Sequence, residues 1–226
     1  MIEKPNRREI CFLSMKRSGH HAVIYWAIQQ MAGDLFFVND SSILHQWGFE
    51  KPVRDLYAYN VEDPNLRETV EAIKGNDRFL GPSGQMDYVL ILRDPYNMIA
   101  SRIEFGAGCQ REHVDLWKEH AREYLNITRH LPDDKIVVSF NEWYKNPAYR
   151  GALSKKFGFA YCEDRYDKVT EEGGGSSFQR GETDATKLNL FDRWKTYQEN
   201  PVYLELISDP ELKTLSDRIF GKIYAV

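Results

Sequence analysis

Two continuous apolar runs constrain the fold more than any other feature of this sequence. Residues 88–92 (YVLIL) and 136–138 (IVV) contain no charged side chain, which is typical of strands that are covered on both faces of a parallel sheet. Similar patterns recur along the chain and alternate with helical ones. We expect strands at 9–14, 35–39, 56–60, 88–93 and 135–140. We expect helices at 20–32, 65–74, 95–105, 113–130 and 147–157.

Strands that alternate with helices form right-handed βαβ units, which place a parallel sheet between two layers of helices. With 226 residues and 42% hydrophobic content, the chain can bury one substantial core. We therefore expect residues 1–226 to form a single α/β domain, with a central parallel β-sheet flanked by helices in three layers (α/β/α). Two more helical patterns lie near 189–199 and 209–221. Ligands of such sheets bind beyond the carboxyl ends of the strands.

The charge and cysteine content exclude several classes of protein. The formal net charge of −4 argues against the basic surface that binds nucleic acid. The three cysteines are too few and too scattered for a disulfide framework. The first residues, MIEKPNRREI, are too polar for a signal peptide, and no apolar run approaches the roughly 20 residues of a membrane span. We expect a soluble cytoplasmic protein without a nucleic-acid partner.

A cationic turn lies between the first expected strand and the first expected helix. Lys16–His21 reads KRSGHH and offers cations, a hydroxyl group and a glycine. Backbone amides and the positive dipole end at a helix N-terminus attract anions. This turn is therefore a candidate anion site, and the alternative is an ordinary strand-to-helix loop with solvated charges.

A second cationic turn follows the strand at 88–93. Asp94 can cap a helix and Pro95 suits its first turn, so Arg93 ends the strand beside a helix start. Ser101 lies two turns into that helix. We expect Arg93 at the sheet edge, outside the core, and the alternative is that it pairs with a carboxylate while Ser101 only packs. Two such turns at one edge indicate a ligand with two separate anionic groups.

Several segments resemble, in order along the chain, motifs of sulfotransferases that use 3′-phosphoadenosine 5′-phosphosulfate (PAPS). Arg17–Gly19 (RSG) is similar to the loop that binds the 5′-phosphosulfate, and Arg93 with Ser101 is similar to the motif that binds the 3′-phosphate. Trp117–His120 (WKEH) and Ile136–Pro147 resemble the segments that come next in cytosolic members. Near the C-terminus, four residues resemble a pattern of protein-tyrosine sulfotransferases: Ser177, Lys187, Asn189 and Trp194.

The resemblance implies a P-loop NTPase-like fold and transfer of a sulfuryl group from PAPS to a hydroxyl or amine of a small-molecule, carbohydrate or peptide acceptor. Adenosine 3′,5′-bisphosphate (PAP) would be the second product. Arg17 would stabilise the leaving phosphate, and the amides of Ser18–His20 would cradle it. The donor-binding residues that the resemblance implies are Lys16, Arg17, Ser18, Gly19, His20, His21, Arg93, Ser101, Ser177, Arg180 and Lys187. No metal is expected, since the histidines lack zinc-ligand spacing.

The chain departs from the family pattern where the nucleotide is held. His20 and His21 replace the usual Thr-Thr pair of the loop. Ala22 stands after the loop, where cytosolic members have an aromatic residue that stacks on adenine, and Asn141 stands where Tyr is common. Trp26 is not a substitute, because an aromatic residue at helical spacing indicates a core position. Adenine recognition is therefore unassigned.

The base that takes the proton of the acceptor has four candidates. Family members use a His or Glu at the carboxyl end of a neighbouring strand. Glu62 and Asp40 each follow an expected strand. His45 and His20 are alternatives, because an unperturbed imidazole titrates near neutral pH. The sequence does not choose among these four residues.

A glycine-rich stretch, Gly173–Gly175, interrupts the last third of the chain. We expect a mobile lid around 171–188, which would close over the 3′-phosphate through Ser177, Arg180 and Lys187 and exclude water. The alternative is a solvated connector between the sheet and the last helices.

Two other functions stay open besides sulfuryl transfer. One is a catalytically silent nucleotide-binding protein of the same fold, because no base is assigned. The other is a P-loop nucleotide kinase, which is disfavoured because the motif Gly-x-x-x-x-Gly-Lys-Ser/Thr is absent. Neither the acceptor nor the oligomeric state follows from the sequence.

Overall fold

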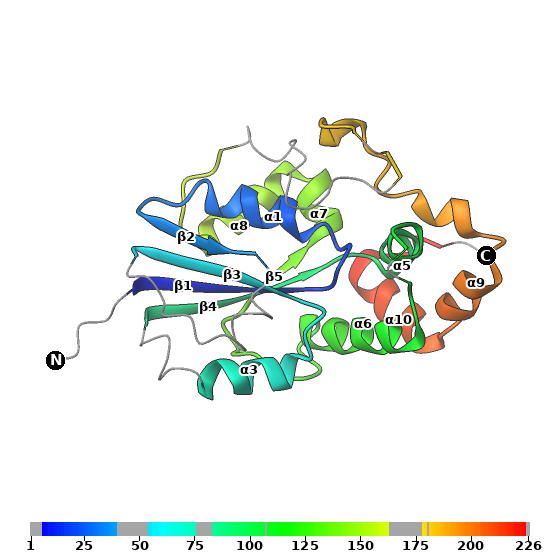
Figure 1. The fold of residues 1–226 in the computed structure, drawn as a ribbon, viewed down its shortest axis with the longest axis horizontal. Helices are drawn as coiled ribbons and strands as arrows, with labels where there is room; N and C mark the ends of the chain where they lie inside the picture. Colours follow the sequence, from blue (N-terminus) through cyan, green and yellow to red (C-terminus); the bar gives the residue numbers. More distant parts are fainter. Residues whose placement is uncertain are drawn as a thin grey trace.

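The computed structural model describes residues 6–39, 54–75, 83–106, 108–162, 178–179 and 181–224. Its centre is a five-stranded sheet in which neighbouring strands are parallel, in the order β2-β3-β1-β4-β5 (Figure 1). The strands are β1 (Asn6–Ser14), β2 (Leu35–Val38), β3 (Leu56–Glu62), β4 (Ser83–Leu92) and β5 (Ile136–Ser139). The predicted α/β class with a central parallel sheet is confirmed.

Helices cover both faces of the sheet and its carboxyl end. Three lie on one face (Figure 1): α1 (His20–Ile28), α7 (Phe140–Lys145) and α8 (Pro147–Phe157). The other face carries α3 (Leu66–Gly75). Four gather toward the carboxyl ends of the strands: α5 (Pro95–Glu104), α6 (Arg111–Tyr124), α9 (Pro201–Ile207) and α10 (Pro210–Phe220). Two short 3₁₀ helices precede α9: η2 (Ala185–Lys187) and η3 (Arg193–Tyr197).

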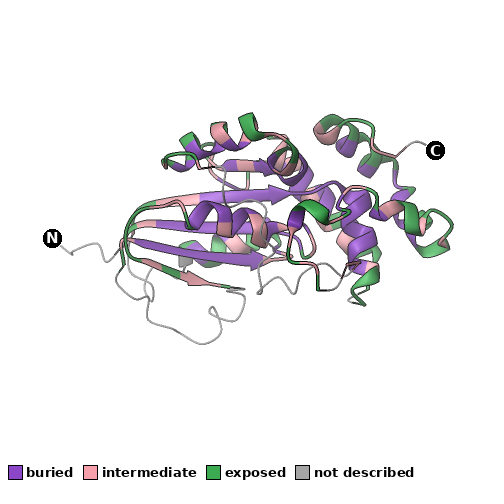
Figure 2. Ribbon diagram, turned by 90° about the horizontal axis from the view of Figure 1, so that it is seen from above, coloured by how far each residue is buried: buried purple, intermediate pink, exposed green. Residues whose placement is uncertain are grey.

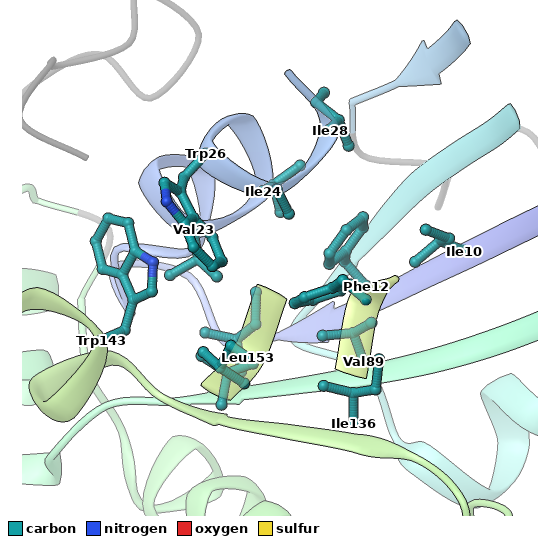
Figure 3. Packing of buried hydrophobic residues seen from close by; sticks show 14 of the residues in the cluster. Ile10, Phe12, Val23, Ile24, Trp26, Ile28, Val89, Ile136, Trp143 and Leu153 are labelled. Atoms are coloured by element: carbon teal, nitrogen blue, oxygen red, sulfur yellow. The ribbon is translucent and has the colours of Figure 1, made fainter. Parts of the chain in front are cut away.

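The core lies in layers on either side of the sheet, because successive side chains of a strand point to opposite faces. In β1, Phe12 packs with α1 and α8, whereas the next residue, Leu13, packs with α3. Figure 3 shows the first layer, where Trp26 of α1 meets Trp143 edge to face, with ring centroids 6.0 Å apart. Trp26 is fully buried, which confirms its prediction as a core residue. Most of β1 and β3 and the carboxyl-terminal half of β4 are buried, whereas the edge strand β2 has no buried residue, and the helices expose their outer sides (Figure 2).

All five strands differ from the expected bounds by one or more residues, and two of these differences concern the carboxyl edge of the sheet. β3 continues through Glu62, so this residue ends a strand instead of following it. Phe140 begins α7 rather than ending β5, because the Ser139 hydroxyl accepts a hydrogen bond from the Glu142 amide and caps the helix.

The helical expectations also need correction. The segment 189–199 forms only the 3₁₀ helix η3. The seven-residue helix α9 was not expected, since so short a helix shows too few periodic positions to be recognised. The helices expected at 20–32 and 113–130 end earlier, at Ile28 and Tyr124. No described helix has both the length and the apolar character to cross a bilayer.

Candidate active site

The Met15–Gly19 loop joins β1 to α1 in a tight turn. Its Ser18 amide donates to the Met15 carbonyl oxygen at 3.1 Å, and both Arg17 (φ 68°) and Gly19 (φ 78°) adopt left-handed conformations. The first amides of α1 have no acceptor within the helix and point out of its N-terminus, where an anion can bind. The Ser18 amide thus closes the turn within the loop, and the cradle expected from the amides of Ser18–His20 stays a prediction.

Gly19 permits close contact between this loop and α7. A Cβ atom at Gly19 would lie 2.4 Å from Cε2 of Phe140, whose side chain is buried. The positive φ adds backbone strain for any other residue. The guanidinium of Arg93 lies over the same Phe140 ring in a cation–π contact, with its Cζ 5.1 Å from the ring centroid. The ring therefore sets the position of both cationic turns.

We expect Gly19→Ala to lower the free energy of unfolding by about 3 kcal/mol, because backbone strain adds to overpacking against the ring. Gly158, which ends α8, is a matched control: it has the same φ of 78°, and a Cβ there would meet only an ordinary contact. Gly158→Ala should cost about 1 kcal/mol, from strain alone. Chemical denaturation compares the two variants, and equal losses would mean that Phe140 does not fix the loop.

Two arginines, Arg17 and Arg193, contact the Ser101 hydroxyl, and Arg93 contacts the backbone of Arg17; we call these three residues the arginine cluster. Arg17 Nε donates to Ser101 Oγ at 3.3 Å, and Arg193 Nη1 donates to the same oxygen at 3.0 Å. Arg93 Nη1 donates to the Arg17 carbonyl oxygen at 3.1 Å, and its Nη2 donates to the Leu190 carbonyl oxygen. The Met15–Gly19 loop, the turn between β4 and α5, and η3 thus each contribute one guanidinium to one place at the carboxyl edge of the sheet.

The arginine cluster concentrates positive charge in a buried place. Arg93 and Arg193 are 2% and 4% exposed. Burial lowers the pKa of Arg93 to about 10, with Asp94 opposing the shift and Arg17 adding to it. Burial and the charges of Arg93 and Arg17 lower the pKa of Arg193 to about 9. Both arginines stay charged at neutral pH, so an anion bound among them would offset their mutual repulsion.

The carboxylate of Asp94, which follows Arg93 in the chain, accepts its hydrogen bonds from groups other than the arginine cluster. Asp94 accepts hydrogen bonds from the Asn97 amide at 2.8 Å and from the Asn141 side chain at 2.9 Å, and so caps α5. The hydrogen bonds of Arg93 go to carbonyl oxygens, and its buried Nε has no hydrogen-bond partner among the described residues. Within the part of the chain that the structure describes, Arg93 therefore forms no ion pair with a carboxylate, which was the alternative to an anion site. Arg93 was expected outside the core, but it is buried instead, because α7 and the Leu190 region cover it.

Arg193 was not among the residues expected at the site. Asn97, in the first turn of α5, fixes its position: Asn97 Oδ1 accepts the Arg193 amide at 2.9 Å, and Asn97 Nδ2 donates to the Phe191 carbonyl oxygen at 3.0 Å. The adjacent Trp194 was singled out, but nothing in the linear pattern sets Arg193 apart. Its role depends on a contact between segments far apart in the chain.

A second group of side chains, which we call the histidine–glutamate cluster, consists of His20, His21 and Glu62. Nε2 of His20 lies 2.9 Å from Glu62 Oε1, and Nε2 of His21 lies 3.7 Å from the same oxygen. The other ring nitrogen of His20 lies 3.2 Å from Ser18 Oγ. Burial would raise the pKa of Glu62, but the hydrogen bond and charge of His20, with His21 and Lys16, hold it below its ordinary value.

An ion pair between Asp63 and Arg102, which we call the clasp, links the carboxyl ends of β1 and β3 to α5. Asp63 Oδ1 accepts the Lys16 amide at 2.9 Å, and the Asp63 amide donates to the Ser14 carbonyl oxygen at 2.9 Å. Arg102 grips both Asp63 oxygens, with the shortest contact at 2.8 Å, and its side chain is 3% exposed. Because Arg102 follows Ser101 and Asp63 follows Glu62, this clasp fixes the distance between the two clusters.

The Trp117–His120 segment supports the site from α6. Trp117 Nε1 donates to the Arg93 carbonyl oxygen at 2.9 Å, and His120 Nε2 donates to the Pro64 carbonyl oxygen at 2.9 Å. Both rings are buried. The segment therefore holds the turn at Arg93 and the connection that follows Glu62, without entering either cluster.

Of the remaining candidates among the described residues, Lys187 lies outside both clusters and Lys16 borders the histidine–glutamate cluster. Lys187 ends η2, where its exposed ammonium pairs with Asp184 at 3.5 Å. Lys16 is exposed, and its Nζ lies 3.9 Å from Glu62 Oε2. Several predictions fall outside the described residues and stay predictions: Asp40, His45, Ser177, Arg180 and the first part of the lid, 171–177.

Comparison with solved structures gives the same architecture. The sulfotransferase domain of the olefin synthase from Synechococcus PCC 7002 matches with a TM-score of 0.58 and 13% identity, over 100% of this chain and 98% of that chain. Mouse sulfotransferase SULT7A1, in its complex with PAP, matches with a TM-score of 0.56 and 11% identity, over 95% of this chain and 85% of that chain. No family model and no curated protein matches the sequence. The chain therefore has the fold of the sulfotransferases.

Proposed function

We propose that this chain transfers a sulfuryl group from PAPS to a hydroxyl or amine of an acceptor. The arginine cluster carries the proposal, because Arg17 and Arg193 meet at the Ser101 hydroxyl beside the Met15–Gly19 loop and Arg93 contacts the backbone of that loop. Two adjacent anion sites suit a donor with two separate phosphate groups. The 5′-phosphosulfate would bind at the loop and the N-terminus of α1, and the 3′-phosphate would bind among Arg93, Arg193 and Ser101.

The proposed reaction is an in-line displacement at sulfur. The acceptor oxygen or nitrogen forms a bond to sulfur while the bond from sulfur to the 5′-phosphate oxygen breaks, and PAP leaves. The acceptor proton passes to a base, and negative charge builds on the departing phosphate. Arg17, oriented by its Nε contact with Ser101, would stabilise that charge, and such preorganised cations contribute most of the catalysis in related transfers.

We assign the base role to Glu62. Both ring nitrogens of His20 are within hydrogen-bond distance of other groups, Ser18 Oγ and Glu62 Oε1, so His20 orients Glu62 and does not face an acceptor. Glu62 ends β3 at the ligand-binding edge, and its second oxygen lies 3.9 Å from the mobile ammonium of Lys16. Its lowered pKa keeps the carboxylate ionised at neutral pH and able to accept a proton.

Glu62→Gln should lower the turnover number by about 10²–10⁴-fold, the usual contribution of a positioned base, and should change PAP affinity far less. Because the pKa of Glu62 is held below 4.5, the wild-type kcat/KM should stay level as the pH falls from about 8 to about 6. The pH profile of kcat/KM checks this expectation. A loss of activity centred near neutral pH, where free histidine titrates, would assign the base to His20 instead.

The proposed function is tested by incubating the protein with PAPS that carries labelled sulfate and a panel of phenols, alcohols, amines, oligosaccharides and tyrosine peptides. We expect label on at least one acceptor class with wild-type protein and a large loss with Arg17→Ala. PAP binding without transfer to any acceptor would favour the silent nucleotide-binding protein. Phosphoryl transfer from ATP would favour the kinase.

A further inference from the structure

His20 and His21 are adjacent in the chain, yet both rings face the same carboxylate. Consecutive residues of a helix normally diverge around its axis. At the first turn of α1 the two ring centroids lie only 4.1 Å apart, and their Nε2 atoms lie 2.9 and 3.7 Å from Glu62 Oε1. Three groups that can each donate an electron pair thus meet at one point, where β3 brings Glu62 beside the N-terminus of α1.

The partners of His20 define what this point can hold. If the Nδ1–H group of His20 donates to Ser18 Oγ, at 3.2 Å, the lone pair of Nε2 faces a carboxylate oxygen. Two electron pairs at 2.9 Å require a positive species between them. A proton can bridge His20 and Glu62, whereas a metal ion can also take Nε2 of His21 as a ligand. Metal-bound histidines usually donate their other N–H group to an oxygen, as His20 can to Ser18.

We propose that His20, His21 and Glu62 form a binding site for a divalent transition metal ion of the zinc class. Two imidazoles with one carboxylate are an established ligand set for such ions, which leave a fourth position open. Tetrahedral ligands at the usual bond lengths lie about 3.3 Å apart, and the 2.9 and 3.7 Å separations bracket this value. One ligand atom from each residue lies within 4.8 Å of the others, so small rotations close the set.

Two neighbouring groups must yield to the ion. Nε2 of His21 lies 2.9 Å from Asn39 Oδ1, and this hydrogen bond is exchanged for a metal bond. Lys16 approaches Oε2 of Glu62 rather than Oε1, at 3.9 Å, and its side chain is 47% exposed. It can therefore turn into solvent. The side chains of the three ligands are only 4–15% exposed, so the site is largely shielded from water.

No ligand of the metal site belongs to the arginine cluster, but His20 and His21 begin α1, so the metal site adjoins the proposed 5′-phosphosulfate site. Its consequence for catalysis rests on the proposed function: a bound ion would occupy the carboxylate that we assign as the base, so metal should slow transfer. Binding of the ion does not depend on that assignment. If the protein binds metal but does not transfer a sulfuryl group, the proposed function is refuted and the metal site stands. If it transfers a sulfuryl group but binds no metal, the metal site is refuted and the proposed function stands.

The test is a titration of chelator-treated protein with Co²⁺ alone, followed by visible absorption, and then displacement of Co²⁺ by Zn²⁺. We expect one ion per chain. Glu62→Gln and His21→Asn should each weaken Co²⁺ affinity by at least about tenfold, since even the outer-shell partners of metal ligands contribute about 10- to 100-fold. His130→Asn is the matched control, because His130 lies between α6 and β5 at the opposite, amino-terminal edge of the sheet.

The outcomes separate this site from others on the molecule. Loss of affinity in both ligand variants, with His130→Asn unchanged and thermal denaturation showing all three folded, supports the site. Absence of a visible cobalt spectrum in the wild type overturns it, as does affinity that neither ligand variant changes. A thiolate-to-cobalt charge-transfer band would also overturn it, because it would place the ion at a cysteine such as the half-buried Cys162.

Discussion

Arg17→Ala should lower the turnover number at saturating PAPS by about 10²–10³-fold, the usual effect of removing one donor to a developing negative charge. The contact of Arg17 strengthens as the phosphate departs, so the variant should lose more in turnover than in PAP affinity. The Arg17 backbone is left-handed, with φ 68°, and Ala suffers the same strain there. The fold should therefore respond less than the chemistry.

Arg17→Lys separates charge from geometry. Lysine keeps the positive charge but cannot grip two oxygens at once, and it loses the Nε contact with Ser101. Its turnover should fall between those of Ala and wild type. The measurement is single-turnover transfer of labelled sulfate at saturating donor, with thermal denaturation as the control for folding. Wild-type turnover in Arg17→Ala would mean that the Met15–Gly19 loop takes no part in the transfer step.

Replacing Arg193 should have the second largest effect, on donor affinity. Arg193→Met keeps the apolar stem and removes the guanidinium that donates to Ser101 at 3.0 Å. Hydrogen bonds to charged groups contribute about 1.5–3 kcal/mol, so PAP affinity should fall by about 10- to 100-fold. The affinity for 5′-AMP, which has no 3′-phosphate, should hardly change. The unliganded variant also loses a charge that Arg93 and Arg17 repel, which offsets part of the lost bonding.

Lys195→Met is the matched control for this variant. Lys195 belongs to the same 3₁₀ helix η3, and its exposed ammonium pairs with Asp192 at 2.9 Å. Its loss removes one positive charge near the site but leaves the arginine cluster unchanged. Because exposed ion pairs contribute little free energy, PAP affinity should stay within about twofold of wild type. Isothermal titration calorimetry compares the two. Equal losses would mean that long-range charge, and not contact with the 3′-phosphate, governs binding.

The sheet and the two cationic turns could be predicted because their signals are local. The apolar runs of β4 and β5 read as buried strands, and Asp94 and Pro95 mark the start of α5 from neighbouring residues alone. Each turn therefore fell next to a strand end, and parallel strands carry their carboxyl ends to one edge. The order β3-β1-β4, which local patterns do not show, then places the two turns beside each other.

The rest of the site could not be predicted because it joins distant segments. Arg193 contacts Ser101 because Asn97 holds the Arg193 backbone in place. Glu62 contacts His20 because β3 pairs with β1. The burial of Arg93 depends likewise on Phe140 and on the Leu190 region, which no strand or helix pattern places over it. Periodicity assigns residues to elements, whereas these contacts depend on how the elements pack.

The most direct test of the account is a comparison of PAP and 5′-AMP binding to the wild-type protein by isothermal titration calorimetry. The two nucleotides differ only in the 3′-phosphate that we place among Arg93, Arg193 and Ser101. Charged hydrogen bonds of this kind predict that PAP binds at least about tenfold more tightly, and that it raises the melting temperature at concentrations where 5′-AMP does not. Equal affinities, or no measurable binding of PAP, would contradict the assignment of the arginine cluster to the donor.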